Sequence, residues 1–146
     1  MKVTRIIMLV AATMIYGCST VGDVSNTAEA SDSTPVGKVT AALAKYHEAL
    51  KTSNVEQAVA AYSDDFANSE GGNKSVLYGY FAQGASMGAL KGITIVMDKC
   101  EFTVDGDFAV AKPVIYSSAQ GSSSYQFRFK KEADGKWRIV NTETIK

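Results

Sequence analysis

The sequence has few of the residues from which metal centres and acid–base catalytic groups are most often built. Its 146 residues include one histidine and two cysteines, and 15 basic residues balance 15 acidic ones. It also has no glycine-rich phosphate loop, nucleophile elbow or paired-thiol motif. The balanced charge excludes the basic footprint of a nucleic-acid-binding protein. We therefore expect no metal, no cofactor and no nucleic-acid partner.

The chain also lacks an apolar run long enough to cross a membrane, but it begins with a shorter one. Lys2 and Arg5 precede an apolar run of about ten residues, whereas a membrane span needs about 20. A basic start, a short apolar core and a small residue before the break are typical of a secretory signal peptide. We therefore predict a signal peptide over residues 1–17.

The end of this signal peptide indicates a lipid anchor. Ile15-Tyr16-Gly17-Cys18 resembles the lipobox of bacterial lipoproteins. That resemblance implies acylation of Cys18, palmitate included, and cleavage before it, so that the protein would be held on the membrane of the cell envelope. Ser19, in place of an aspartate that retains lipoproteins at the inner membrane, favours the periplasmic face of the outer membrane. The alternative is an ordinary signal peptide with an incidental cysteine.

Residues 18–37 are expected to form the lipidated cysteine and a flexible tether, and residues 38–146 a single folded domain. The tether is rich in Ser, Thr, Asn, Asp, Ala and Gly and shows no periodicity. Loss of residues 1–17 leaves 13 basic residues against 15 acidic, so attachment would depend on the acyl chains. Lipidation of Cys18 would leave Cys100 as the one free thiol, which we expect to be sheltered.

Three helices are predicted at the start of the domain. Thr34-Pro35 suits a helix start, and the first helix carries an apolar stripe of Val39, Leu43, Tyr46 and Leu50. Ser53 with Glu56 matches a capping box for a second helix. That helix is expected to run through Phe66 and to bury Val55, Val59, Tyr62 and Phe66. Asn73 can cap a third helix with apolar positions at Leu77, Tyr80, Phe81 and Met87.

From Ile93 onward the apolar period is two, which predicts a four-strand antiparallel meander. The parity of the first strand changes between Met97 and Cys100, as a β-bulge would produce. The later strands alternate at three sets of positions: Phe108, Val110, Val114 and Tyr116; Tyr125, Phe127 and Phe129; and Trp137 and Ile139. Helices followed by a meander predict an α+β fold whose helices cover a curved sheet.

This order of elements resembles the NTF2-like superfamily, the cone-shaped, cystatin-like fold of SnoaL-like proteins and ketosteroid isomerases. The resemblance covers about residues 38–145. Its best local marks are Tyr62-Ser63-Asp64-Asp65-Phe66 and Gly135-Lys136-Trp137-Arg138-Ile139-Val140. Both motifs belong to the scaffold, which carries enzymes, ligand binders and dimerisation modules alike.

The resemblance to ketosteroid isomerases implies candidate catalytic residues. By spacing, Tyr46 falls at the position of their oxyanion-donating tyrosine and Glu70 at that of their carboxylate base. Tyr125 takes the place of their second acid, which this sequence lacks. His47, the one histidine, could serve as a base in a related hydrolase or dehydratase. An isomerase or cyclase acting through Tyr46, His47 and Glu70 is therefore one alternative.

The favoured alternative is non-catalytic binding of a small apolar ligand or a partner protein. The expected cone is lined by aromatic residues and has few groups for proton transfer. Asn141 and Glu143 share the parity of Trp137 and are the predicted polar groups of its inner face. The ligand-binding candidates are Tyr116, Tyr125, Trp137, Asn141 and Glu143. A third alternative is a structural module that forms a homodimer or docks to an envelope protein through outer positions such as Ser124, Gln126 and Arg128.

Overall fold

The computed structural model describes residues 33–146, so the predicted signal peptide, Cys18 and tether residues 19–32 lie outside the described residues. Residues 35–37, which were expected in the flexible tether, belong to the first helix instead. Three helices come first, α1 (Pro35–Lys51), α2 (Val55–Ala60) and α3 (Lys74–Ser86). A short 3₁₀ helix, η1 (Ala89–Gly92), leads into the sheet. The strands are β1 (Thr94–Val96), β2 (Glu101–Asp105), β3 (Phe108–Ser118), β4 (Gly121–Lys131) and β5 (Trp137–Ile145).

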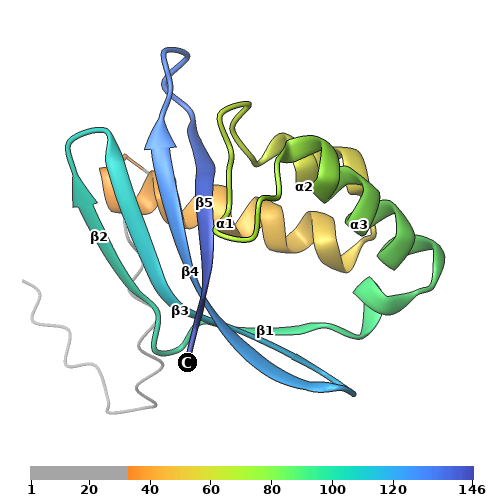
Figure 1. The fold of residues 1–146 in the computed structure, drawn as a ribbon. Helices are drawn as coiled ribbons and strands as arrows, with labels where there is room; N and C mark the ends of the chain where they lie inside the picture. The colour runs from red at the N-terminus through yellow and green to blue at the C-terminus, as the bar shows by residue number, and fades with distance from the viewer. Residues whose placement is uncertain (1–32) are drawn as a thin grey trace, which may run out of the picture.

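The five strands form one curved antiparallel sheet with the helices on one side of it (Figure 1). β3, β4 and β5 pair in sequence order, and β1 and β2 both pair with β3. The α+β fold is thus confirmed. The strand expected to bulge near Cys100 is instead interrupted there, which makes five strands in place of four. Among residues 33–146, no helix has the length and hydropathy to cross a bilayer.

The first helix forms as predicted. Thr34 is its N-cap and accepts a hydrogen bond from the Gly37 N–H at 3.0 Å, and Pro35 occupies the first turn. Capping by a threonine oxygen satisfies one of the amides that a helix start leaves unpaired. The apolar stripe of α1 is fully buried against the sheet; it consists of Val39, Leu43, Tyr46 and Leu50.

The second helix is much shorter than predicted, and its cap is different. Asn54 is the N-cap of α2 and accepts from the Gln57 N–H, so the expected capping box at Ser53 is wrong. The helix ends because the chain after it pairs with β5 as a strand would. The N–H of Ser63 donates to the carbonyl of Ile139 at 2.9 Å, and the N–H of Ile139 donates to that of Ala61.

The third helix begins at the predicted cap, since Asn73 accepts from the Val76 N–H at 3.1 Å. It contains no fully buried residue. Leu77 and Phe81 are half-buried, whereas Tyr80 and Met87, which the spacing placed on the apolar face, are exposed.

Two register shifts change which side chains face the helices. One lies between Ala111 and Val114 on β3. Before it, Ala109 and Ala111 are buried, so the inward orientation expected of Phe108 and Val110 is wrong. Phe108 lies on the outer face, where the Arg128 guanidinium stands 5.0 Å from its ring centre.

The other shift lies beside Arg128 and Phe129, where β4 pairs with β5. Ile139 is opposite Phe129, but Thr142 is opposite Phe127. The two inward positions of β5 therefore have different parity, as a β-bulge produces.

Candidate functional site

A cavity with a volume of about 300 Å³ lies between the sheet and the helices of the described chain and is open to solvent. Every layer contributes to it: α1, α3, η1, β3, β4 and β5 all supply lining residues. Apart from four tyrosine hydroxyls and one threonine, the lining is hydrocarbon. The lining residues are Tyr46, Leu50, Tyr62, Leu77, Phe81, Leu90, Ile93, Tyr116, Tyr125, Phe127 and Thr142.

Two of the phenol groups are joined deep in the cavity wall. The Tyr62 hydroxyl donates to the Tyr46 hydroxyl oxygen at 2.8 Å. Their rings are 5.4 Å apart and nearly perpendicular, an edge-to-face geometry that aromatic pairs prefer. Since Tyr46 accepts this bond, its own O–H proton remains able to donate to a further acceptor.

A second pair joins α1 to β3. The Nε2 atom of His47 lies 3.2 Å from the Tyr116 hydroxyl oxygen, and the two rings are perpendicular. The Tyr116 ring in turn packs edge-on against that of Tyr125, with centroids 5.3 Å apart. Tyr116 thus contacts the His47 imidazole through its hydroxyl group and also lines the cavity.

Burial disfavours the charged forms of three of the tyrosines and of His47. Burial raises the pKa of Tyr46 to about 12, although hydrogen bonds with Tyr62 and Tyr116 oppose the change. It also raises the pKa values of Tyr62 and Tyr116 well above their ordinary value. Burial, with a smaller contribution from the Lys51 charge, lowers the pKa of His47 to about 4. Near neutral pH the site therefore presents neutral phenols and a neutral imidazole.

The structure brings only some of the candidate residues together. Tyr46, Tyr116 and Tyr125 line the cavity, and His47 is behind Tyr116. Glu70 lies in an exposed turn before α3, where its N–H donates to the Asn68 side chain, and it is not part of the cavity lining.

The three candidates on β5 do not line the cavity. Trp137 is buried, and it lines a different concave surface together with residues of α1 and α2. The inner-face parity predicted for Asn141 and Glu143 is wrong, because the register shift beside Arg128 intervenes. Asn141 donates to the Ala67 carbonyl at 3.0 Å, and Glu143 is exposed.

Several lining residues were not predicted as site residues. Thr142 was missed because strict alternation from Trp137 skips it. Leu90 lies in η1, a short helix with no periodic signal in the sequence, and Ile93 directly follows it. Tyr62 was expected among the aromatic residues that line the cone, but on a helix, and it reaches the cavity from the segment that bridges to β5.

The described residues offer no arranged metal site and only a weakly reactive thiol. No group of three or more His, Cys, Asp or Glu residues in 33–146 is arranged to hold a metal ion. Cys100 is half-buried, and burial raises the pKa of its thiol to about 11, so it is a poor nucleophile near neutral pH.

Comparison with known proteins gives a similarity of fold. No family model matches the chain, and no curated protein matches its sequence. Among solved structures it is similar to an NTF2-like protein of unknown function from Pseudomonas putida, with 14% identity over 75% of this chain and 84% of that one and a TM-score of 0.60. It is also similar to a cystatin-like-fold protein of unknown function from Nostoc punctiforme, with 17% identity, 73% and 86% coverage and a TM-score of 0.59.

A third similar structure is that of a candidate ketosteroid isomerase from Shewanella frigidimarina. The two share 19% identity over 79% of this chain and 98% of that one, with a TM-score of 0.57. These identities are too low to transfer an activity, but the agreement in architecture is extensive. The chain therefore has the NTF2-like, cystatin-like fold.

Proposed function

We propose that the protein is an envelope lipoprotein whose NTF2-like domain binds a small apolar ligand in the cone cavity without transforming it. The observation that supports this proposal is the composition of the cavity lining, hydrocarbon with a few neutral hydroxyl groups. Ligand sites are mostly apolar with a small number of polar groups that fix orientation. The volume of about 300 Å³ is at the small end of such sites, so a compact molecule fits best.

The phenols suggest how the ligand would be oriented. Tyr46 accepts from Tyr62 and keeps a proton to donate, so a ligand carbonyl or hydroxyl oxygen could be bound there. The raised pKa of Tyr46 keeps that proton in place. A compact, mainly apolar molecule with one oxygen acceptor is the class of ligand we propose.

The isomerase alternative has one supporting feature, the phenol pair that could stabilise an oxyanion. It also needs a base beside the reacting carbon. Glu70, the candidate for that role, lies in an exposed turn outside the lining. Binding without proton transfer therefore accounts better for this cavity.

A thermal-shift screen of small aromatic and alicyclic ketones, phenols and fatty acids tests the proposal. Binding stabilises the folded state by about 2.7 kcal/mol when the ligand is at a hundredfold excess over its Kd. A hit should be weakened by Tyr46→Phe and unaffected by Tyr80→Phe, the matched change at an exposed tyrosine. Product analysis of each hit with wild type and with Glu70→Gln separates the alternatives, since conversion that stops in Glu70→Gln would establish the enzyme.

The membrane anchor is tested separately. We expect Cys18→Ser to release the protein to the soluble fraction or to leave residues 1–17 attached. Intact-mass analysis of detergent-extracted wild type should show acyl chains on a chain that begins at Cys18. A processed chain without acyl groups would refute the lipoprotein assignment and leave export intact.

A further inference from the structure

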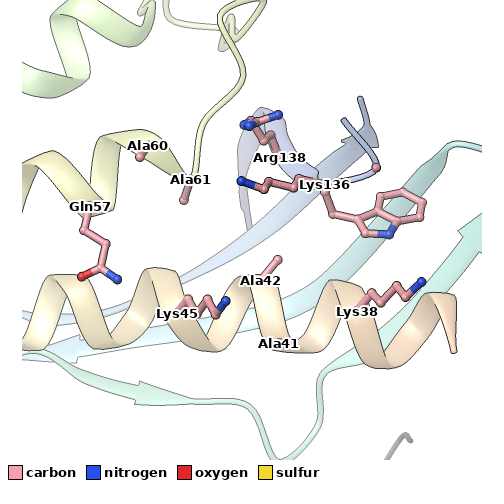
Figure 2. Close-up of a pocket in the computed structure, with 11 residues that line it drawn as sticks. Lys38, Ala41, Ala42, Lys45, Gln57, Ala60, Ala61, Lys136 and Arg138 are labelled. Carbon is pink, nitrogen blue, oxygen red and sulfur yellow. The ribbon is translucent and has the colours of Figure 1, made fainter. Parts of the chain in front are cut away.

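A second concave surface, which we call the basic groove, lies outside the cone between α1, α2 and the hairpin that joins β4 to β5. Its volume is about 470 Å³, and it shares no lining residue with the cavity. Figure 2 shows Lys38 and Lys45 rising from α1, with Lys136 and Arg138 opposite them on the hairpin and β5. The groove is thus bordered by positive charge on two sides.

None of the lining residues carries a negative charge. Arg138 forms ion pairs with Glu132 and Asp134. By contrast, no ion pair within residues 33–146 involves Lys38, Lys45 or Lys136. Unpaired charges of one sign around a concave surface concentrate the potential and attract oppositely charged ligands.

The shape of the groove follows from small side chains between the lysines. Lys38 and Lys45 are seven residues apart on α1, so they lie on one side of the helix about 10 Å apart along its axis. Ala41 and Ala42 form the floor between them. An elongated ligand could therefore lie along α1 with an anionic group near each lysine.

Two further residues are suited to such a ligand. The side-chain amide oxygen of Gln57 accepts a hydrogen bond from the Asn54 side chain, so the two N–H groups of the Gln57 side chain are left to donate. Trp137 is among the residues that line the groove and is 7% exposed. The groove thus combines hydrogen-bond donors with a nearly buried tryptophan.

We propose that the basic groove binds an elongated, soluble polyanion whose carboxylate or phosphate groups are about 10 Å apart, the axial separation of Lys38 and Lys45. This site shares no lining residue with the apolar cavity, so a negative result for ligand binding in one does not affect the proposal for the other. Lysine ammonium and guanidinium groups bind carboxylates and phosphates through charge-assisted hydrogen bonds, which are stronger than neutral ones.

The groove carries its own reporter, because Trp137 is the only tryptophan in the chain. A chain that begins at Ser19 keeps every described contact and suits solution measurements. We would titrate it separately with trigalacturonate and with tetrapolyphosphate, and use neutral maltotriose as the control. We expect a saturable change in Trp137 fluorescence with at least one anionic probe and none with maltotriose.

Charge-matched variants give the decisive comparison. The triple variant Lys38→Gln, Lys45→Gln, Lys136→Gln should bind at least about tenfold more weakly, since it removes three charge-assisted contacts. The control Lys91→Gln, Lys99→Gln, Lys146→Gln removes the same charge from exposed positions outside the groove and should bind as wild type does. Circular dichroism checks that both variants fold.

Three outcomes would overturn the proposal. These are no saturable response to either anionic probe, equal weakening in the groove and control variants, and a response to maltotriose that matches the anionic ones. Vesicles of phosphatidylglycerol and of phosphatidylcholine form a further arm. Binding to phosphatidylglycerol vesicles without binding to the soluble anions would replace the proposal with docking of the groove to a membrane surface.

Discussion

The cavity and the basic groove lie on different sides of the same helix and are built from opposite kinds of residue. Lys45 and Tyr46 are neighbours in the chain, yet one borders the groove and the other lines the cavity. The cavity is defined by packing, since its walls are the hydrophobic core itself. The groove is defined by charge and by small residues on a solvated surface. Substitutions should therefore affect the two regions through different physical terms, and to very different extents.

The largest effect is expected for the cavity wall. Phe127 is 2% exposed and packs against Tyr46, Tyr116 and Phe129. Phe127→Ala should lower the free energy of unfolding by about 3–5 kcal/mol, because it removes buried apolar contacts and enlarges the cavity. Urea denaturation measures the change. A loss below about 1 kcal/mol would mean that this wall is not part of the packed core.

The next effect concerns pH and the buried imidazole beside the cavity. The pKa of His47 is lowered in the folded protein to about 4 from 6.5, so the unfolded chain binds this proton more readily. The stabilisation is complete above about pH 6.5 and is lost as pH falls toward 4, up to about 3 kcal/mol in all. His47→Gln should flatten the dependence of stability on pH between 4 and 6.5.

This pH window is distinct from that of the exposed carboxylate near the groove. The Arg138 guanidinium lowers the pKa of Asp134 to about 2, so the contribution of Asp134 is lost only at lower pH. Denaturation of wild type and His47→Gln at pH 7.5, 5.5 and 4.5 would isolate the histidine. Parallel curves for the two proteins would show that His47 is protonated as readily in the folded state as in the unfolded one.

A smaller effect is expected where the groove is joined to the core. Ser63 is 1% exposed, and its hydroxyl donates to a Glu132 carboxylate oxygen at 2.6 Å. The other oxygen of Glu132 accepts from Arg138. Ser63→Ala should cost about 2 kcal/mol, the typical value for a hydrogen bond to a charged group. Ser69→Ala, at an exposed serine, is the matched control, and an equal change in both variants would refute the role of the bond.

The smallest effect is expected on the groove itself. Lys45 is exposed and forms no ion pair within the described residues. Lys45→Gln should change the free energy of unfolding by no more than about 0.5 kcal/mol in either direction, as is usual for surface substitutions. A clear gain in stability would show that the cluster of like charges strains the fold, which would sharpen the contrast with Tyr46 on the same helix.

The parts of the fold that were predicted correctly are those in which periodicity and packing agree. The stripe from Val39 to Leu50 predicts the buried face of α1, and Phe127 with Phe129 predicts that of β4. Long side chains at a regular spacing have one way to be buried, so local pattern and tertiary structure coincide. The curved α+β architecture follows from these elements.

The failures occur where distant pairing overrides local pattern. Helical spacing through Phe66 cannot reveal that Tyr62 pairs with Ile139, and alternation along β5 cannot reveal the shift that brings Thr142 inward. The basic groove was not predicted at all, since Lys38 and Lys136 are far apart in sequence and meet only after the hairpin packs over α1. Sites of this kind depend on tertiary structure, and composition gives no signal for them.

The lack of any fully buried residue in α3 has a consequence for the stability of one wall of the cavity. Leu77 and Phe81 of this helix form part of the cavity wall, yet the helix presents much of its surface to water. Segments with few buried apolar contacts open locally at a lower free energy than the core does. Backbone amides of α3 should therefore exchange with deuterium well before those of β4, whose Phe127 and Phe129 are almost fully buried. Local opening of α3 would then widen the cavity for a guest molecule while the sheet stays folded.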